Sequence, residues 1–590
     1  MNILLCALNA KFIHSSLALR SLSANAAEYA RHIDMLEFGI NNTIDFMLKE
    51  IGLKSPDILC FSCYIWNISL VEELAAIIRK VSPHIKIILG GPEVSFPPFE
   101  LLGGLADIIA FGEGEDTFKE LCGHFLSGAP ALPEIKGIAY CSADTVISQD
   151  TAVSKDTLAT GNIIVNEPRE LPELSALAFP YNDLHDTANK IIYYESSRGC
   201  PFSCAYCLSS AAEGVRFLEL PLTISHIDFF LKNSVKLVKF VDRTFNCDGP
   251  GALRIWRYII DNDNGVTSFH FEIGADLLTD EQIDCLKNAR PGLIQFEAGV
   301  QSTNGATLKE VLRVMNFEKL CENIQKIKAN QNIHLHIDLI AGLPLEDMAA
   351  FKKSFNDCFA LRPHMLQLGF LKLLKGSSLR RDAGKYGIVY RDTAPYEVLF
   401  TKHMSFDELL ILKDIENLTE LYYNSGLFAA TLEYALTMFD TPFDFFFDFS
   451  LFWNKKDLHK ESHSKLVRYE ILYRYLSGQK GVDLTLLKDL LKFDMFMNEN
   501  VKNLPEWLER TDYAPIKSKI NAFFADASAT KKYFPTVPDR RPKELRSMCH
   551  IERFKFNILA WLNEGRKEYS QNYCLFIYDD SKLKVIMIDL

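Results

Sequence analysis

The sequence predicts an α/β protein in three parts, and two features of its pattern lead to this fold class. Short apolar segments alternate with amphipathic helical segments in residues 1–130 and again in residues 186–385, which is typical of parallel sheets covered by helices. From residue 390 to residue 590, long helical periodicities replace this alternation. We therefore expect a Rossmann-like (flavodoxin-like) domain, a Pro-punctuated linker over residues 131–185, a partial TIM-type barrel and a mainly helical C-terminal domain.

The composition is that of a soluble globular chain, because 48% of the 590 residues are hydrophobic and 24% are charged. No apolar run is long enough to cross a bilayer, and the N-terminus lacks the basic residues of a secretory signal. We therefore expect a cytoplasmic protein with no membrane partner. A net charge of −12 without a long basic block argues against nucleic acid as a partner.

In the N-terminal part, short apolar segments each end in small or polar residues. Four of them are expected to be strands, NILLCAL, DILCFSCYI, KIILGGPEVS and DIIAFGEGE, with helical segments such as SLVEELAAIIRKV between them. Ligands bind such sheets beyond the carboxyl ends of the strands, at the point where the strand order reverses. The candidate binding residues at those ends are Asn9, Ser62, Gly90, Gly91, Glu93 and Gly112.

The barrel part contains six strand candidates, which makes six β/α units where a full TIM barrel has eight. They are KIIYYESS, KLVKFVDRTF, SFHFEIGADL, GLIQFEAGVQS, IHLHIDLIAGLP and MLQLGFLKLL. A capping box of Thr279 and Gln282 predicts the start of one intervening helix.

A short loop after the first of these strands, SSRGCPFSCAYCLSS, carries Cys200, Cys204 and Cys207. Unrelated thiols are one interpretation and structural zinc is another, but zinc prefers four closed ligands. The nearest histidines, His185 and His226, are not at ligand spacing. Three thiolates around a cubane iron–sulfur cluster would leave one iron open to another ligand.

The spacing C-x-x-x-C-x-x-C, with the aromatic Tyr206 before the last cysteine, resembles the radical S-adenosylmethionine (SAM) superfamily. The resemblance implies a 4Fe–4S cluster on the three cysteines. It also implies that the amine and carboxylate of SAM chelate the open iron, and that an electron from the cluster cleaves SAM to a 5′-deoxyadenosyl radical. A partial (βα)6 barrel is the fold of that family, and the strand count agrees.

Further barrel segments resemble the cobalamin-associated members of the family. VDRTF stands where many members have a glycine-rich segment that holds the SAM amine, and Asp242 is our candidate for that contact. FEAGVQS resembles an E-x-G-x-Q-S segment, which implies Gln301 and Ser302 near the SAM ribose and carboxylate. With Glu272 and Glu297 these are the expected cofactor-binding residues of the barrel, although hydrogen-bonded Glu and Gln can also be purely structural there.

In the segment HLHID, side chains two residues apart point to the same face of the strand. His334, His336 and Asp338 therefore share one face, as the ligands of a mononuclear metal site do. No further ligands are identifiable on other strands, so satisfied barrel-lining side chains are the better interpretation.

Because LGGPE and FGEGE precede the cysteine loop, the N-terminal part resembles the cobalamin-binding domain of class B radical SAM enzymes. The D-x-H-x-x-G motif that ligates cobalt through His is absent, and His14 lacks its spacing. The resemblance therefore implies cobalamin without a protein His on cobalt, or a degenerate domain that binds none. The C-terminal part resembles an appended domain of unassigned role. Within it the aromatic run TPFDFFFDFSLFW is expected to be a packed seam and residues 573–590 a β-hairpin.

The expected activity is cobalamin-dependent methylation of an unactivated carbon of a small-molecule substrate, with an electron donor such as flavodoxin or ferredoxin. Radical cyclisation or reduction without methyl transfer stays open, as does a non-catalytic regulator that binds cobalamin or SAM. Methylthiotransfer is rejected. It needs three more cysteines in the N-terminal domain, and Cys60 and Cys63 share one strand while LGGPE has no thiol.

Overall fold

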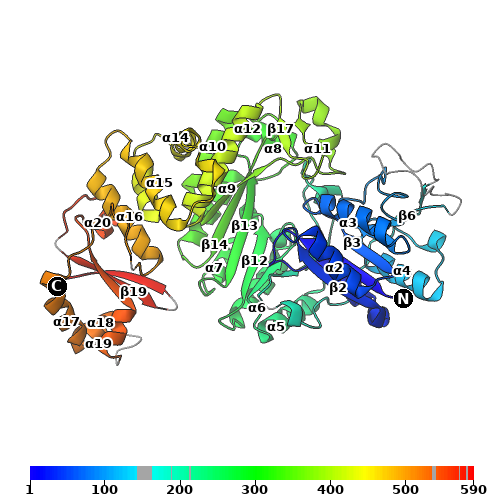
Figure 1. Ribbon diagram of the computed structural model, residues 1–590, viewed down its shortest axis with the longest axis horizontal. Coiled ribbons are helices and arrows are strands. Elements are labelled where there is room, and N and C mark those ends of the chain that lie inside the picture. The colour runs from blue at the N-terminus through cyan, green and yellow to red at the C-terminus, as the bar shows by residue number, and fades with distance from the viewer. Residues whose placement is uncertain are drawn as a thin grey trace. The chain divides into compact units, whose positions relative to one another are not determined.

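The computed structural model describes residues 1–142, 163–187, 189–211, 214–501, 503–534, 540–570, 572–579 and 582–590 (Figure 1). Residues 143–162 of the expected linker lie outside the described residues. The chain forms two compact units, which are taken in turn. The first comprises residues 1–354 and 368–409, and the second comprises residues 355–367 and 410–590.

A seven-stranded sheet in the order β2-β1-β3-β4-β5-β6-β7 forms the N-terminal domain. The first five of these strands are parallel, and their order is that of the flavodoxin-like fold, which confirms the expected class. The strands are β1 (Ile3–Asn9), β2 (Ile33–Gly39), β3 (Ile58–Ser62), β4 (Lys86–Gly90), β5 (Ile108–Ala110), β6 (Ile138–Cys141) and β7 (Ile163–Val165). The helices are α1 (Leu17–Asn25), α2 (Ile44–Lys54), α3 (Ile68–Val81) and α4 (Glu115–Ser127).

Strand β1 shows why the apolar runs of this domain are nearly continuous. Leu4, Cys6 and Leu8 belong to one hydrophobic core, and the alternate residues Ile3 and Leu5 belong to another. Helices cover both faces of the sheet, so the side chains that point to either face are buried. The sequence analysis did not anticipate β2, whose mostly half-buried side chains fit the edge of the sheet. Strands β6 and β7 add an antiparallel pair inside residues 131–185, so the sheet continues past residue 130.

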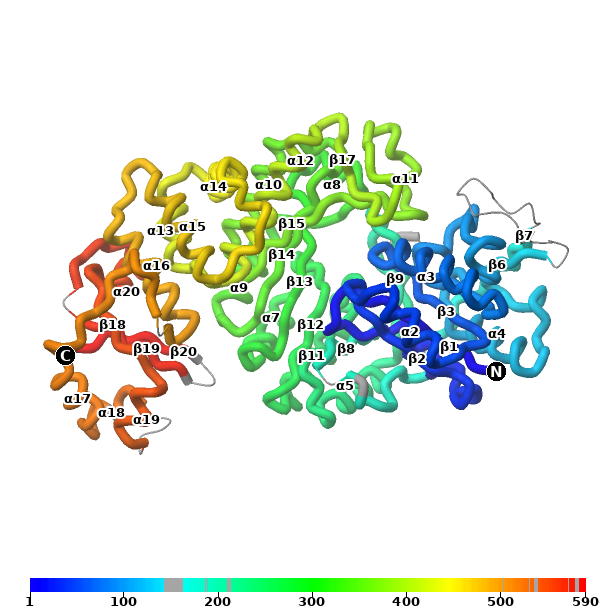
Figure 2. The backbone as a smooth tube through the Cα atoms, in the orientation of Figure 1, coloured from blue at the N-terminus to red at the C-terminus, as the bar shows by residue number. Residues whose placement is uncertain are grey.

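All six expected barrel strands are present, in the sheet order β15-β14-β13-β12-β11-β8 (Figure 2). Neighbouring strands from β8 to β14 pair in parallel. The strands are β8 (Ile192–Tyr194), β11 (Leu237–Phe240), β12 (Ser268–Ile273), β13 (Ile294–Gln301), β14 (His334–Ala341) and β15 (Met365–Phe370). The helices between them are α5 (Leu220–Lys232), α6 (Gly249–Asp261), α7 (Asp280–Leu286), α8 (Gly305–Glu310), α9 (Phe317–Lys328) and α10 (Met348–Ala360).

Side chains along β13 and β14 alternate between buried and half-buried positions. The buried set packs under the helices, where Phe296 lies 5.4 Å from Trp256 between ring centroids. The half-buried set lines the lumen of the partial barrel and carries most of its polar groups. The capping box at α7 is confirmed, because Gln282 N donates to Thr279 Oγ1 at 3.3 Å and Thr279 N donates to Gln282 Oε1 at 3.0 Å.

The second unit is mainly helical and ends in an antiparallel sheet. The aromatic run lies on α14 (Pro442–Lys455), where Phe449 stacks on Tyr475 at 4.3 Å, so its role as a packed seam is confirmed. Strands β19 (Tyr573–Asp579) and β20 (Lys582–Ile588) form the expected hairpin beside β18 (Cys549–Arg553). Its other helices include α12 (Phe406–Leu418), which begins in the first unit, α13 (Ala429–Leu436), α15 (Lys465–Ser477), α16 (Leu484–Asn498) and α17 (Lys517–Ala525).

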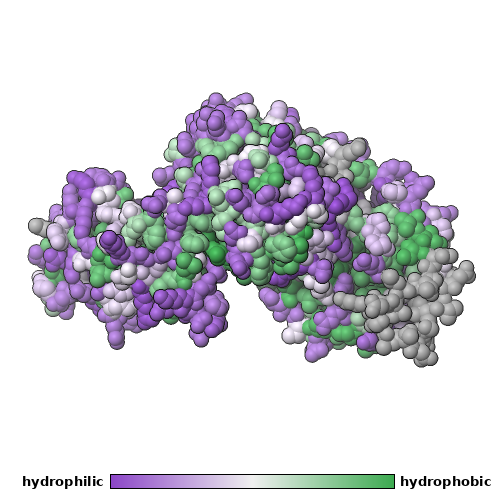
Figure 3. All heavy atoms as spheres, turned by 90° about the horizontal axis from the view of Figure 1, so that it is seen from above, coloured by the Kyte–Doolittle hydropathy of each residue, from purple (hydrophilic) through white to green (hydrophobic). Residues whose placement is uncertain are grey.

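The face drawn in Figure 3 is mostly hydrophilic, with hydrophobic side chains in separate patches. Within the described ranges, no helix has both the length and the apolar character needed to cross a membrane.

Candidate functional site

The cysteine loop follows β8 and the short strand β9 (Ser197–Gly199), at the carboxyl end of the first barrel strand. Cys204 is 6% exposed, whereas Cys200 and Cys207 are half-buried. Two backbone contacts fix the loop at Ala205. Its N–H donates to Val311 O at 2.9 Å, and its carbonyl accepts from Leu379 N at 2.9 Å. The three thiols that the spacing singled out are therefore presented on one anchored loop.

Gly199 sets the entry to this loop. It pairs with Val215 of β10 (Val215–Phe217), and its backbone has φ +105°. A Cβ at this position would overlap the carbonyl oxygen of Gly214. Only glycine allows both the left-handed backbone and the close approach of the two strands.

The chemistry of the loop fits an iron–sulfur cluster. All three cysteines are thiols and not disulfides. Each cysteine of a cubane binds a different iron, so the thiols need not converge on one ion. No three His, Cys, Asp or Glu side chains in the described part of the chain are placed to share a single metal ion. Cys200 Sγ lies 3.7 Å from Thr244 Oγ1, and hydrogen bonds to cluster sulfurs tune such sites.

Arg313 is a site residue that the sequence analysis missed. Its Nη1 lies 3.8 Å from Cys204 Sγ and 3.5 Å from the Tyr206 hydroxyl, and its Nη2 donates to Gly299 O. Its Nε is buried and has no hydrogen-bond partner. Arg313 follows α8 and does not stand at a strand end, so a search of strand ends could not find it.

Glu297 is a satisfied carboxylate in the lumen. It accepts hydrogen bonds from Lys239 Nζ and His270 Nε2, both at 3.0 Å. Burial raises the pKa of Glu297, but these hydrogen bonds and the two nearby charges outweigh burial and lower the pKa to about 2. For Glu297, the contacts therefore favour the structural role that was left open.

Glu272 and Asp338 differ from Glu297, because each is held closer to its neutral form. Burial first, and then the charge of Glu297, raises the pKa of Glu272 to about 7. Burial and the charges of Glu297 and Glu272 raise the pKa of Asp338 well above its ordinary value. A raised pKa favours the protonated form of the Asp338 carboxyl, which can donate a hydrogen bond as well as accept one.

Three buried polar atoms of the lumen lack a hydrogen-bond partner, namely Gln301 Oε1, Arg313 Nε and Asp338 Oδ1. Their residues lie close together around Gly299. Gly299 pairs with Asp338 across β13 and β14, and a Cβ on Gly299 would meet the amide nitrogen of Gln301 and, at 3.6 Å, Arg313 Nη2. Buried polar atoms are nearly always hydrogen-bonded, so this cluster points to a polar ligand. The hydroxyls, amine and carboxylate of SAM match its donors and acceptors.

Asp242 and Ser302 are engaged within the protein. The Asp242 carboxylate accepts from Ser196 N at 3.0 Å, Ser196 Oγ at 2.7 Å and Ser197 Oγ at 2.6 Å. Ser302 Oγ donates to Glu346 Oε1 at 2.5 Å. These contacts favour support of the loops that follow β8 and β13 over a direct contact with SAM.

The row HLHID also has internal contacts. His336 Nε2 and His334 Nδ1 share a hydrogen bond of 2.9 Å, and burial lowers the pKa of His336 to about 4. His336 therefore lines the barrel as a neutral side chain.

The expected ligand edge of the N-terminal domain lies at the ends of β1, β3 and β4. Strands β1 and β3 are neighbours where the strand order reverses, and Ser62 Oγ at the end of β3 is buried without a partner. Gly91, with φ +111°, brings the chain so close that a Cβ would lie 2.6 Å from Cys63 O. Two large apolar side chains follow the same strands, since Phe12 is 80% exposed and Trp66 is 45% exposed. This edge fits a large, partly apolar ligand such as cobalamin.

Other candidates on this edge hold the domain together. Asn9 Nδ2 donates to Glu37 Oε2 at 2.8 Å. Glu93 Oε1 lies 3.2 Å from Lys375 Nζ and accepts from the Tyr396 hydroxyl, which ties it to the segment after β15. Gly90 ends β4, and Gly112 follows β5 with φ +79°. Asn9 and Glu93 are thus engaged in protein contacts, whereas the glycines leave backbone exposed to a ligand.

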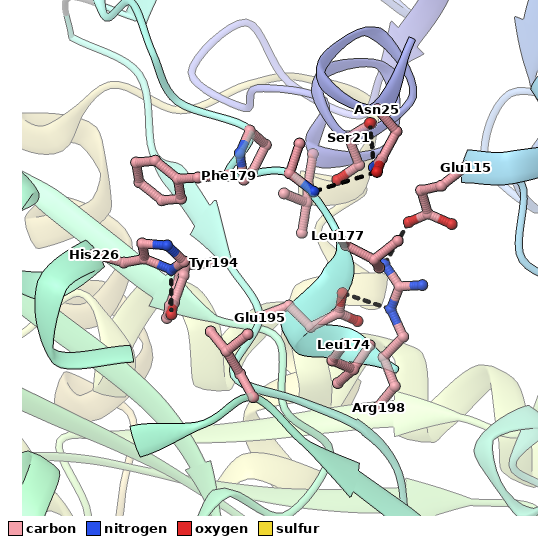
Figure 4. Close-up of a pocket in the computed structure, with 14 residues that line it drawn as sticks. Ser21, Asn25, Glu115, Leu174, Leu177, Phe179, Tyr194, Glu195, Arg198 and His226 are labelled. Carbon is pink, nitrogen blue, oxygen red and sulfur yellow. Dashed lines mark hydrogen bonds and ion pairs between the residues drawn. The ribbon is translucent and has the colours of Figure 1, made fainter. Parts of the chain in front are cut away.

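A small pocket lies beside the cysteine loop where α1, residues 174–180, β8 and α5 meet (Figure 4). Arg198 stands on its wall between Glu115 and Glu195, and His226 approaches Tyr194 from the other side. The Tyr194 hydroxyl and His226 Nδ1 are 3.1 Å apart, and burial lowers the pKa of His226 to about 4. The sequence analysis named none of the side chains that contact Arg198 as a site residue.

Three family models match successive parts of the chain. Residues 3–122 match the B12 binding domain, residues 194–358 match the radical SAM superfamily, and residues 384–576 match a protein of unknown function, DUF4080.

Three relatives illustrate the range of similar proteins. A 2-(S-pantetheinyl)-carbapenam-3-carboxylate methyltransferase of Streptantibioticus cattleyicolor is 26% identical over 53% of this chain and 46% of its own length. The cobalamin-dependent radical SAM methyltransferase TokK of Streptomyces tokunonensis is 24% identical over 54% of this chain and 48% of its own. An anaerobic magnesium-protoporphyrin IX monomethyl ester cyclase of Rubrivivax gelatinosus is 22% identical over 54% of this chain and 57% of its own. The chain thus spans only about half the length of these relatives.

Solved structures share the fold. OxsB, a cobalamin-dependent SAM radical enzyme with aqua-cobalamin and SAM bound, superimposes with a TM-score of 0.56 at 14% identity, over 86% of this chain and 82% of that chain. The radical SAM methyltransferase TsrM of Kitasatospora setae superimposes with a TM-score of 0.52 at 15% identity, over 67% of this chain and 80% of that chain. The chain is a radical SAM protein with an N-terminal B12-binding domain and a C-terminal domain of unknown function.

Proposed function

We propose that the protein is a cobalamin-dependent radical SAM enzyme that methylates an unactivated carbon of a small-molecule substrate. When bound, the 4Fe–4S cluster and SAM supply a 5′-deoxyadenosyl radical by reductive cleavage, and cobalamin supplies a methyl group. The observation that carries the proposal is the anchored loop of three cysteines next to the unsatisfied polar atoms of the lumen.

Four residues of the lumen offer different groups for contacts with SAM. Arg313 provides a fixed positive charge for a carboxylate, and its two ends contact the cysteine loop and β13. Gln301 Oε1 and Asp338 Oδ1 offer hydrogen-bond partners for hydroxyl groups. Glu272, with a pKa of about 7, adds a carboxyl that can accept or release a proton near neutral pH. Each of these groups is supported by a barrel strand or the segment after α8, so little reorganisation is needed on binding.

For cobalamin, the supporting features are the orphaned Ser62 hydroxyl, the close backbone approach at Gly91 and the exposed Trp66. A B12-binding model over residues 3–122 agrees with this placement. We expect these residues to contact the ligand without a histidine on cobalt.

The electron for SAM cleavage has to come from another protein, and we propose a flavodoxin or ferredoxin as that partner. All fourteen cysteines are thiols in the structure, which suits a reducing compartment such as the cytoplasm.

The test is anaerobic purification of the full chain with cobalamin supplied, followed by iron analysis, absorption spectra and an assay for deoxyadenosine with SAM and a reductant. We expect iron-dependent absorbance, bound cobalamin and deoxyadenosine, and loss of deoxyadenosine in Cys204→Ala. Zinc in place of iron, or deoxyadenosine formed by Cys204→Ala, would contradict the proposal.

Radical cyclisation is a second candidate, because one relative is named as a cyclase. SAM labelled in its methyl group separates the two. Methylation moves the label into cobalamin and then into product, whereas cyclisation leaves it on methionine. A loaded chain that forms no deoxyadenosine would instead favour a non-catalytic regulator.

A further inference from the structure

Two arginines lie directly opposite each other on the β9–β10 hairpin, at the entrance to the cysteine loop. Arg198 pairs with Arg216 in the antiparallel register, and Cys200 follows Arg198 after one residue. Like charges at directly opposite positions destabilise an antiparallel pair. The two strands can therefore pair without a large loss of stability only if nearby anions compensate the charges of both arginines.

The N-terminal domain supplies two of these anions. Glu113 accepts from Arg198 Nη1 at 2.7 Å through one oxygen and from Arg216 Nη2 through the other. Glu115 Oε1 accepts from Arg198 Nη2 at 2.5 Å. Both acids follow Gly112 at the end of β5, on the sheet edge that we assign to cobalamin.

The barrel completes the arrangement. Glu195 Oε2 accepts from Arg198 Nε at 2.7 Å (Figure 4). With Glu113 and Glu115, the Arg198 guanidinium therefore binds three carboxylates. Arg216 Nη1 also donates to Pro172 O at 2.5 Å, which fixes the second guanidinium. We name the five residues Glu113, Glu115, Glu195, Arg198 and Arg216 the carboxylate clamp.

The clamp is shielded from water. Its side chains are between 7% and 25% exposed. Charge-assisted hydrogen bonds in such a place are short, directional and weakly screened by salt. The clamp therefore holds its two sides in one geometry more firmly than an exposed ion pair does.

We propose that the carboxylate clamp positions the ligand edge of the N-terminal domain against the cysteine loop, with Glu113 as its central positioning residue. Its consequence for catalysis rests on the proposed function, because it fixes the separation of bound cobalamin from the cluster. Reactions between two held groups are sensitive to this separation, since a displacement of about 1 Å can cost roughly 100-fold in rate. Glu113 is central because it contacts both arginines.

The test compares Glu113→Gln, Arg216→Gln and their double variant with Glu170→Gln, a matched control. Glu170 belongs to an exposed pair with Lys136 at 2.8 Å, outside the clamp. In the full chain loaded with cobalamin and cluster, pulsed electron paramagnetic resonance measures the distance between Co(II) and the reduced cluster. We expect one narrow distance distribution in the wild type and in Glu170→Gln, and its loss in both clamp variants. The effect of the double variant should be smaller than the sum of the two single effects, because both changes break the contact between Glu113 and Arg216.

Hydrogen exchange of the full chain without cofactors gives a second measurement. Backbone amides of residues 108–116, 195–211 and 214–217 should exchange about tenfold faster in Glu113→Gln, the effect of losing a charged hydrogen bond, and at the wild-type rate in Glu170→Gln. The proposal is overturned if Glu113→Gln keeps either the narrow distribution or the wild-type exchange. A wild-type chain that takes up no cobalamin or iron would defeat the proposed function, whereas the exchange measurement would still decide the clamp.

Discussion

Arg313 Nη1 donates to Cys204 Sγ across 3.8 Å, which joins the segment after α8 to the cysteine loop. The same guanidinium donates to Gly299 O on β13, so it spans the loop and the lumen. Its unsatisfied Nε shows that the protein does not use the whole donor set of this side chain. A planar guanidinium with donors to spare is suited to hold a carboxylate, and lysine cannot replace its geometry.

We predict that Arg313→Gln weakens SAM binding by about 10- to 100-fold, the effect of losing a charged hydrogen bond, while the cluster still assembles. Equilibrium dialysis of labelled SAM against the reconstituted protein measures the affinity, and iron analysis measures the cluster. Arg257→Gln is the control, because Arg257 forms an exposed pair with Glu281 at 3.5 Å. Unchanged SAM affinity in Arg313→Gln would contradict this role.

Most of the framework could be predicted from the sequence because it follows from local pattern. Six apolar strand segments and one cysteine spacing were enough to anticipate the barrel and its loop, and both are present. Strand β2 escaped because, as an edge strand, most of its side chains are only half-buried and it forms no continuous apolar run. The extension of the first sheet by β6 and β7 was missed because these short strands join it antiparallel, outside the β/α rhythm.

The site was less predictable, since its contacts join residues far apart in the chain. The sequence analysis named Glu272, Glu297 and Gln301 as cofactor-binding candidates, but it could not show that Lys239 and His270 already satisfy Glu297. Asp338 was judged to be a satisfied lining residue, and the structure leaves its Oδ1 without a partner. Such differences depend on three-dimensional neighbours, which spacing along one strand does not encode.

Glu272 should make stability depend on pH. Its pKa rises from 4.5 to about 7 in the folded chain, so the folded state binds this proton more tightly than the unfolded state. The carboxyl therefore contributes stability below pH 4.5 that is lost as pH rises toward about 7. At about 1.4 kcal/mol per pKa unit, this loss is at most about 3 kcal/mol, and partial exposure reduces it.

The variant Glu272→Gln removes this proton-binding group. Calorimetry of wild type and variant at about pH 5 and about pH 8 should show a smaller decrease in unfolding temperature for the variant. Equal decreases in the two proteins would show that Glu272 titrates in the folded chain as it does in water.

Gly199 should be indispensable for iron uptake. Alanine would force a Cβ into the Gly214 carbonyl and would also occupy a left-handed backbone at φ +105°. We expect Gly199→Ala to lose most of its iron after anaerobic reconstitution, because the entry to the cysteine loop is displaced.

Gly214→Ala is the matched control, since that glycine has φ +74° but no atom within 4 Å of its added Cβ. Its penalty is backbone strain of about 1 kcal/mol, so it should retain iron. Equal iron content in both variants would contradict the prediction.

A substitution at Gly91 should weaken cobalamin binding without preventing the chain from folding. A Cβ there would approach Cys63 O at 2.6 Å and move the loop that follows β4. We therefore expect Gly91→Ala to retain less cobalamin than wild type by absorption spectroscopy after gel filtration, while its iron content is unchanged. Gly104→Ala adds a methyl group in the same domain with no atom within 4 Å, and it should bind cobalamin normally. If Gly91→Ala kept its full complement of cobalamin, the ligand edge would have to be sought elsewhere.

The second unit has a buried ion pair whose removal tests how that unit is held together. Lys492 Nζ lies 3.1 Å from Glu552 Oε1 and donates to Arg553 O at 2.9 Å, with side chains that are 7% and 2% exposed. Removing one partner of a buried pair costs about 3–5 kcal/mol, whereas removing both charges is far milder. Glu552 keeps its contact with His550 Nε2 at 3.0 Å, so we expect a cost at the lower end of this range. Lys492→Met should therefore accelerate hydrogen exchange in β18 by about 100-fold or more, and Lys492→Met with Glu552→Gln should reverse most of that effect. Lys465→Met breaks the more exposed pair with Glu499 at 3.0 Å and should leave β18 unchanged. If the double variant exchanged as fast as Lys492→Met, the cost would lie in lost packing of the lysine stem and not in the charge left on Glu552.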